Sequence, residues 1–330
     1  MVLGAEGVSE EVANWSVSFR LDVMRGPPPS VSHLWADEAG SYNVFCAGNA
    51  EEQAKIFWVS LDNVACVRID LASRHADVWP LAADTPRYGL EHFWFDQVLP
   101  GLYDIDGQLA LHAGAVDLGG SAIVILGPSG RGKSTLVASL ATRQSPALND
   151  DGVFVTCERE RFAVSPFYKG LRLLPETLAH FFGPETETAP VSSYATKRRV
   201  MRQDILTEGP IQIGALIFLG EPRQSSAIDV RRMTATEACM GLVSQSFALD
   251  PTDRKRAAAR LERASKLASK VPAFALSYPR DFSRLVDVHA TIKALLIDHA
   301  GAQTAIDCSP LAPHLTSTDE RSADLDIRAV

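Results

Sequence analysis

Cysteine is scarce in this chain and is not arranged for a structural role. Five cysteines, an odd number, are scattered over 330 residues, and no two of them form a C-x-x-C pair. This pattern argues against a disulfide framework and against a zinc site built on paired cysteines. We therefore expect buried or incidental thiols in a protein of the reducing cytoplasm.

Long apolar runs and an excess of positive charge are also missing. No stretch approaches the roughly 20 apolar residues of a membrane-spanning helix. The first residues lack the basic and apolar segments of a secretory signal, so we expect no signal and no membrane partner. The formal net charge of −8 gives no general attraction to nucleic acid, so we expect no nucleic-acid partner. What is present is an ordinary globular composition, with 46% hydrophobic and 22% charged residues.

A glycine-rich segment carries the strongest functional signal. Residues 127–134 read G-P-S-G-R-G-K-S, which is a complete G-x-x-x-x-G-K-[ST] phosphate-binding motif. An apolar run at 121–126 precedes it and apolar residues at helical spacing follow it over 136–143, as expected of a strand, a turn and a helix N-terminus. In such a motif the lysine reaches the β- and γ-phosphates and the hydroxyl is a magnesium ligand. The predicted nucleotide-binding residues are Gly127, Pro128, Ser129, Gly130, Arg131, Gly132, Lys133, Ser134 and Thr135.

Two adjacent carboxylates form the second signal. Asp150 and Asp151 lie between the predicted loop helix and the next predicted strand. Neighbouring carboxylates are costly to place together unless a cation or a proton lies between them. Beside a nucleotide site, one of them suits a metal ion and the other suits proton abstraction from an attacking hydroxyl. A solvated turn with a capping aspartate is the alternative.

The order of predicted elements indicates an α/β protein in two parts. Residues 1–103 contain short strand-like stretches and read as a small β-rich N-terminal lobe, with an amphipathic helix over 86–100 that ends at Pro100. Residues 104–301 mix strands and helices without strict alternation, which predicts a mixed sheet rather than a parallel one. Residues 302–330 are polar and predict a disordered tail.

A candidate histidine lies upstream of the loop. His112 falls in a predicted strand over 109–116, and pairing of that strand with 121–126 as a hairpin would bring His112 to the start of the phosphate loop. There it would be able to bond a catalytic aspartate and tune its pKa. A lone histidine is more often a satisfied structural residue.

His112, the loop, and Asp150-Asp151 resemble, in order and spacing, the HPr kinase/phosphorylase family. His112 stands fifteen residues before Gly127, and the two aspartates stand seventeen and eighteen after Lys133. The resemblance implies a kinase domain with a fold like phosphoenolpyruvate carboxykinase, ATP with Mg²⁺, and a serine hydroxyl as acceptor. It implies Asp150 as the base, Asp151 and Ser134 at the metal, and His112 paired with the acid group. The family forms hexamers, which leaves a homo-oligomer open.

The chain also departs from that family. Thr135 stands where the family has an acidic residue, and a later glycine-rich element is reduced to residues 168–172, which speaks against a reverse phosphorylase activity. The sequence in this region resembles a divergent branch of the family, whose kinases occur beside ribosomal-peptide tailoring enzymes, including lasso-peptide systems. A peptide serine is therefore favoured over HPr as the substrate. Since phosphoryl transfer benefits from cations over the transferring oxygens, Arg172 and Lys197 complete the predicted catalytic set. Surface charge or a structural ion pair is the alternative for both residues.

Other functions stay open at this stage. A P-loop ATPase or nucleotide switch would use Glu221, which ends an apolar run, as its metal-site acid. A kinase for free serine and a non-catalytic binding module are further alternatives, and GTP is an alternative to ATP. Seven basic residues over 254–270 would suit an acidic partner, although a solvated helix face is the commoner explanation.

Overall fold

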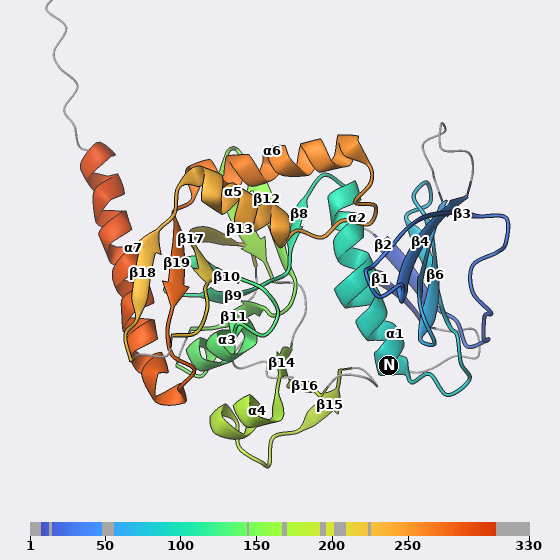
Figure 1. The fold of residues 1–330 in the computed structure, drawn as a ribbon, viewed down its shortest axis with the longest axis horizontal. Helices are drawn as coiled ribbons and strands as arrows, with labels where there is room; N and C mark the ends of the chain where they lie inside the picture. The colour runs from blue at the N-terminus through green and yellow to red at the C-terminus, as the bar shows by residue number, and fades with distance from the viewer. Residues whose placement is uncertain are drawn as a thin grey trace, which may run out of the picture.

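The computed structural model describes residues 8–12, 15–47, 56–143, 145–166, 170–191, 196–200, 209–223 and 226–307, with side chains for all of these except 8–12 and 298–307. Figure 1 shows an N-terminal sheet, a helical stretch beside it, and a larger sheet covered by helices. Of the helices placed in this part of the chain, none is both long and apolar enough to cross a membrane. The predicted α/β class with a mixed sheet is confirmed.

The N-terminal sheet has seven strands in the order β1-β2-β7-β6-β5-β4-β3. Its neighbours pair antiparallel, except β2 and β7, which pair parallel. The strands are β1 (Val8–Val12), β2 (Trp15–Phe19), β3 (Ser32–Ala36), β4 (Tyr42–Ala47), β5 (Ile56–Leu61), β6 (Ala65–Asp70) and β7 (His75–Pro80).

One continuous helical stretch follows this sheet and packs against it. It comprises α1 (Arg87–Phe93), the π-helical turn η1 (Trp94–Val98) and α2 (Leu99–Ile105). The prediction that it ends at Pro100 is wrong, because proline occupies the first turn of α2, where its missing N–H costs little. The predicted boundary between residues 103 and 104 therefore falls inside α2.

The larger sheet runs β11-β9-β10-β17-β13-β12-β8, and β19 joins it beside β17 and carries β18. β10 and β17 pair parallel, as do β17 and β19, while the other pairs are antiparallel. Its strands are β8 (Leu109–Leu111), β9 (Ala113–Asp117), β10 (Ala122–Leu126), β11 (Ala147–Asn149), β12 (Val153–Glu158), β13 (Arg161–Ser165), β17 (Ile211–Leu219), β18 (Asp229–Arg232) and β19 (Ala273–Ser277).

Helices cover both faces of this sheet. Alternate residues of β10 face opposite ways: Ala122, Val124 and Leu126 enter a core with α5 (Ala235–Ser244) and α6 (Arg254–Lys270). Ile123 and Ile125 enter a second core with α3 (Lys133–Ala141) and α7 (Leu285–Asp307). This period-two burial on both sides explains why 121–126 is an unbroken apolar run. The helix α7 extends to Asp307, six residues into the predicted tail, and 308–330 lie outside the described residues.

The predicted strand over 109–116 is divided at His112. β8 pairs with β12, whereas β9 pairs with β10 and β11, so the chain changes partners at this residue. The backbone N–H of His112 leaves the sheet and donates to the carbonyl of Gln245 at 2.6 Å. The predicted hairpin itself is confirmed, because Ala113 lies opposite Leu126 and places His112 beside the start of the glycine loop.

A small third sheet, β14-β16-β15, lies below the larger one in Figure 1. It comprises β14 (Leu171–Leu173), β15 (Thr188–Pro190) and β16 (Arg198–Val200), with α4 (Pro175–Phe181) following β14. Leu171, Leu173 and Val200 are buried in the core that contains α3 and α7. The third sheet thereby packs next to the helix that begins at the glycine loop.

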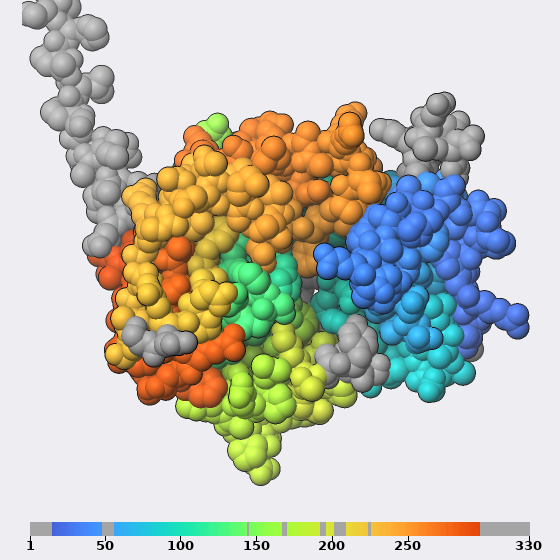
Figure 2. Space-filling model, in the orientation of Figure 1, coloured from blue at the N-terminus to red at the C-terminus, as the bar shows by residue number. Residues whose placement is uncertain are grey.

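The helical stretch 87–105 joins the two larger sheets. Its apolar residues enter the core of the first sheet together with Leu249, which lies between α5 and α6. A Cβ added at Gly101 would meet the Leu249 backbone at 3.0 Å, so the two segments approach closely. On the other side, Asp104 pairs with Arg260 at 2.8 Å and Arg263 at 3.0 Å on α6. The first sheet, helix and larger sheet thus form one packed body, as Figure 2 also shows.

The basic residues of α6 are mostly paired within the chain. Besides the two arginines on Asp104, Arg256 pairs with Asp253, Lys266 with Glu262 and Lys270 with Glu160. Asp253 also caps the helix, as its side chain accepts from two backbone N–H groups of the first turn. This pairing favours a structural role for the charges over a docking surface.

The four described cysteines are free thiols, in line with the absence of a disulfide framework.

Candidate active site

The glycine loop (Gly127–Ser134) lies between the fully buried strand β10 and the N-terminus of α3. Gly127, Gly130 and Gly132 all have positive φ, at 144°, 78° and 95°. A Cβ at Gly127 would in addition lie 3.0 Å from the carbonyl oxygen of Leu219 on the adjacent strand β17. Only glycine suits such positions, and the resulting turn directs the start of a nine-residue helix toward the cavity, where an anion is favoured.

Lys133 is folded back onto the loop. Its side chain is buried, and Nζ donates to the carbonyl oxygens of Gly127 at 2.7 Å and Pro128 at 3.3 Å. Burial lowers the pKa of this lysine, while Asp151 works in the opposite direction. The ammonium group is therefore held inside the curve of the loop, where a phosphate of a bound nucleotide would replace the carbonyls as its partner.

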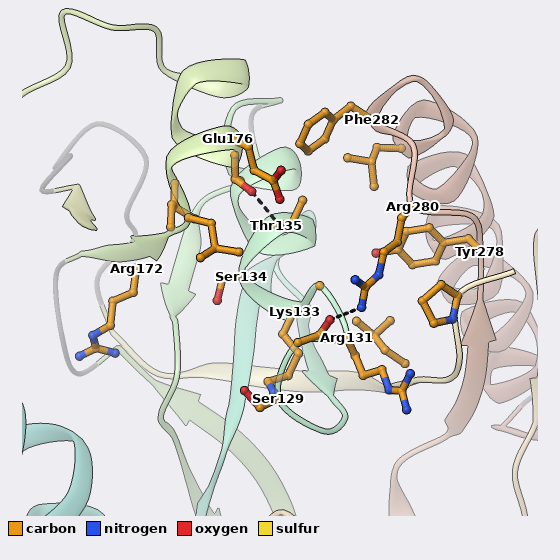
Figure 3. A pocket seen from close by; sticks show the side chains of 18 of the residues that line it. Ser129, Arg131, Lys133, Ser134, Thr135, Arg172, Glu176, Tyr278, Arg280 and Phe282 are labelled. Carbon is orange, nitrogen blue, oxygen red and sulfur yellow. Dashed lines mark hydrogen bonds between the residues drawn. The ribbon is translucent and has the colours of Figure 1, made fainter. Parts of the chain in front are cut away.

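A cavity of about 360 Å³ lies against the loop. This volume is in the range of small-molecule sites. Figure 3 shows its two walls: Ser134, Thr135 and Glu176 on one side, and Tyr278, Arg280 and Phe282 on the other. The predicted site residues that line it are Ser129, Gly130, Arg131, Gly132, Lys133, Ser134, Thr135, His112, Asp151, Arg172 and Lys197. The lining does not include Gly127, Pro128 or Asp150.

Asp150 and Asp151 occupy different environments within one turn. Asp150 follows β11 and is buried, at 4% exposure, and its Oδ2 accepts the backbone N–H of Arg172 at 2.7 Å. Its Oδ1 has no hydrogen-bond partner among the described residues. Burial, with the neighbouring Asp151, raises the pKa of Asp150 to about 6, against the opposing effect of Lys197 and Arg172. A carboxyl group in this state is a candidate proton acceptor near neutral pH.

Asp151 has a left-handed backbone, with φ of 70°, which turns its carboxylate to the cavity while Asp150 stays inside. Its Oδ2 lies 3.3 Å from Lys197 Nζ and 3.8 Å from Arg172. Burial works to raise the pKa of Asp151, but Lys197, Arg172 and His112 together hold it below its usual value. Asp151 is therefore the ionised member of the pair, and non-glycine residues in this backbone region are often found at functional sites.

His112 lies beside Asp151. Burial is the largest effect and lowers its pKa, with help from Lys133, while the charge of Asp151 and a hydrogen bond to the Asp151 backbone work to raise it. The imidazole is thus a largely neutral group against the turn and the loop lysine. Its ring also contacts Phe247 edge to face, with centroids 6.1 Å apart.

The guanidinium of Arg172 is engaged differently from the prediction. It was expected to face transferring phosphate oxygens, yet it is 2% exposed, donates to the carbonyl oxygen of Asp150 at 2.8 Å, and forms an ion pair with Asp96 on the π-helical turn. Figure 3 shows its side chain turned away from the glycine loop. Arg172 contacts the aspartate turn through its backbone N–H and its guanidinium, and part of it lines the cavity.

Asp96 is a site-linked residue that the sequence did not single out. It lies 76 residues from Arg172, in a helix predicted only for its apolar side, and no local motif marks it. Its contact arises from the packing of the third sheet against the helical stretch 87–105, which cannot be read from the local sequence.

The far wall presents two further contacts to the loop. Arg280 donates to the carbonyl oxygen of Gly130, and Arg131 forms an ion pair with Glu221. The Glu221 side chain is 77% exposed and is not among the cavity-lining residues, although Gly220 and Pro222 on either side of it are. Thr135, where the resembled family has an acid, instead bonds Thr177 at 3.2 Å and ties α3 to α4.

The side chains at the cavity can be compared with the ligands that a magnesium ion requires. Among the described side chains there is no cluster of three or more histidine, cysteine or acidic groups that would hold a metal alone. Mg²⁺ usually takes one or two protein oxygens, with substrate phosphates and water completing its shell. Ser134 and Asp151 both line the cavity and would supply these one or two protein oxygens.

Comparison with known proteins gives a narrow result. No family model matches the chain, and no curated protein matches it. Among solved structures, the chain is similar to the Hpr(Ser) kinase/phosphatase from Coxiella burnetii, with a TM-score of 0.36 and 12% identity; the match covers 60% of this chain and 96% of that one. A likeness of this size carries no argument about activity, so the function must rest on the site itself.

Proposed function

We propose that this protein is a kinase that transfers the γ-phosphoryl group of ATP to a serine hydroxyl of a peptide or protein. The observation that carries the proposal is that the glycine loop and the aspartate turn, separate in sequence, border one cavity. Asp151, His112 and Lys197 line it together with Lys133 and Ser134. A nucleotide-binding loop facing an aspartate turn is the arrangement that phosphoryl transfer to a hydroxyl needs.

The chain's own groups divide the work of the step. The loop N–H groups and Lys133 bind the β- and γ-phosphates and stabilise their negative charge. Asp150 takes the proton of the serine hydroxyl while the serine Oγ attacks the γ-phosphorus. The new bond joins serine Oγ to the γ-phosphorus, the bond from that phosphorus to the β,γ-bridging oxygen breaks, and ADP leaves with the electron pair.

The two aspartates support this division. Asp150 has the raised pKa of a base and an unpartnered oxygen, whereas Asp151 is held ionised and faces the cavity. Pairs of carboxyl groups whose environments push their pKa values apart commonly have different roles in catalysis. Asp150 does not line the cavity, so the turn must shift before its carboxylate reaches the acceptor hydroxyl. Such shifts are common, because catalytic contacts often tighten when the substrate binds.

We assign Mg²⁺ to Ser134 and Asp151. When bound with the nucleotide it would neutralise charge on the phosphates. Lys197, at 3.3 Å from Asp151, would add a cation beside the same carboxylate. GTP is the alternative nucleotide.

The acceptor class is the finer part of the proposal. We favour a serine in a peptide, including a ribosomal precursor peptide of the lasso type, because the resemblance points there. Leu174, which lines the cavity and is 41% exposed, offers an apolar contact for a larger acceptor. A kinase for free serine is the alternative within the same chemistry.

The test is phosphoryl transfer from γ-labelled ATP with Mg²⁺ to three acceptors: serine-bearing peptides, HPr and free serine, with free phosphate followed in parallel. Wild type is compared with Asp150→Asn and with Glu221→Gln, a matched loss of one carboxylate outside the cavity. We expect label on serine in wild type and Glu221→Gln, and a loss of at least about 100-fold in Asp150→Asn. Release of free phosphate alone, lost in Glu221→Gln but not in Asp150→Asn, would establish an ATPase instead.

A further inference from the structure

The helical stretch 87–105 presents two acidic side chains to the third sheet. Asp96 forms an ion pair with Arg172 on β14, and Glu91 lies 4.0 Å from Arg199 on β16. Arg172 and Arg199 are direct cross-strand partners, so their side chains leave neighbouring points of the same small sheet. Two acids on one helix therefore meet two arginines on one sheet.

The π-helical turn explains how these acids reach one side. Glu91 and Asp96 are five residues apart, and in a straight α-helix of 3.6 residues per turn such residues lie on different faces. The π turn at Trp94–Val98, whose hydrogen bonds close over five residues, adds the residue that brings them together. Such turns are frequent at functional sites.

The charges around Arg172 give Asp96 an electrostatic role in addition to its packing contact. Arg172 is almost fully buried, and its guanidinium lies between Asp96, the carbonyl oxygen of Asp150 and the carboxylate of Asp151 at 3.8 Å. His92 bonds the second oxygen of Asp96 and fixes the carboxylate in place. Without Asp96, the buried cation would lose one of its counter-charges, and the attraction toward Asp151 would be less opposed.

We propose that Asp96 is a positioning residue of the active site, acting through Arg172 to hold the Asp150–Asp151 turn in its working geometry. The helix that packs on the first sheet is then part of the catalytic apparatus, which gives residues before 104 a role in the reaction. This inference rests on the proposed kinase function. It concerns the geometry of the turn, since contacts of Asp96 lead to the turn by way of Arg172.

The test compares Asp96→Asn with Asp106→Asn. Asp106 caps the same helical stretch and pairs with Arg74 and Trp15, away from the cavity, so it is a matched loss of a paired carboxylate. We expect Asp96→Asn to lower kcat by about 10- to 100-fold, the usual effect of losing a supporting contact, and to raise the KM for ATP only as far as the Mg²⁺-dependent part of ATP binding is lost. Asp106→Asn should keep the wild-type kcat, and Asp96→Glu should recover part of the loss.

A double variant shows whether Asp96 works through Arg172. If it does, Asp96→Asn added to Arg172→Met causes no further fall in kcat, because the group it acts on is already gone. The double variant also removes the buried positive charge of Arg172, which Asp96→Asn alone would leave without its partner Asp96. It can therefore be measured even if Asp96→Asn alone folds poorly. Equal kcat in Asp96→Asn and Asp106→Asn, or fully additive losses, would overturn the inference.

A second readout separates this inference from the proposed function. The Mg²⁺-dependent gain in affinity for a fluorescent ATP analogue is measured for each variant, since Asp151 belongs to the same turn. We expect Asp96→Asn to lose most of that gain while its metal-free affinity stays within about twofold of wild type. If wild type transfers no phosphate, the kinase proposal fails, while an intact Mg²⁺-dependent gain in Asp96→Asn would overturn the positioning role on its own.

Discussion

His289 gives the stability of this protein a defined dependence on pH. It lies on α7, is 6% exposed, and shares a buried hydrogen bond of 3.0 Å with Ser139 on α3, the helix that follows the glycine loop. Burial lowers its pKa from 6.5 to about 4, and the charges of Arg143 and Lys293 add to the effect. The folded protein therefore keeps this imidazole neutral at pH values where the unfolded chain protonates it.

The direction in which stability changes with pH follows from proton binding to His289. Below pH 6.5 the unfolded state binds a proton at His289 that the folded state does not, so the free energy of unfolding falls as the pH drops from 6.5 toward 4. Each pH unit in this window is worth about 1.4 kcal/mol, which sets a limit of about 3 kcal/mol for this group. Between pH 7 and pH 5 the expected loss is about 2 kcal/mol.

The assay is urea unfolding at pH 7 and pH 5, comparing wild type with His289→Gln. Other groups titrate in both proteins and cancel in the difference between them. The stability advantage of wild type over His289→Gln should shrink by about 2 kcal/mol between the two pH values. A difference that stays constant within about 0.5 kcal/mol would refute the assignment of a neutral, desolvated histidine at this position.

Three further predictions concern packing and charge. Asp104→Asn leaves two arginines of α6 without their buried partner and should cost about 3–5 kcal/mol in urea unfolding, whereas a cost below about 1 kcal/mol would show that the pair contributes little. Gly114→Ala places a Cβ 2.5 Å from Val137 on α3, so we expect a loss of about 1–3 kcal/mol and weaker ATP binding; unchanged binding would show that α3 adjusts freely. Glu221→Gln should leave phosphoryl transfer within about twofold of wild type, and a larger loss would place Glu221 in the reaction.

The local parts of the site could be predicted from the sequence. The glycine loop, its strand and helix, and the neighbouring aspartates are each specified by short segments, and the hairpin of β9 with β10 places His112 as expected. Apolar periodicity and turn residues suffice for such features because they depend on neighbours in the chain.

The parts that failed depend on distant packing. The contact of the Arg172 guanidinium with Asp96, 76 residues away, has no signal in the local sequence. The strand over 109–116 is broken at His112 because its two halves pair with different strands. Pro100 does not end its helix because a π turn precedes it and starts a new helical segment. Tyr168 and Lys169, in the reduced family element, lie outside the described residues.

The most direct test of the central claim is the fate of the γ-phosphoryl group in wild type, Lys133→Met and Asp150→Asn, with Mg²⁺-ATP and a mixture of serine-bearing peptides. The account predicts phosphoserine in wild type alone: Lys133→Met fails because ATP no longer binds well, and Asp150→Asn fails although it still binds ATP. Phosphoserine formation by Asp150→Asn at the wild-type rate, or free phosphate as the only product of wild type, would contradict it.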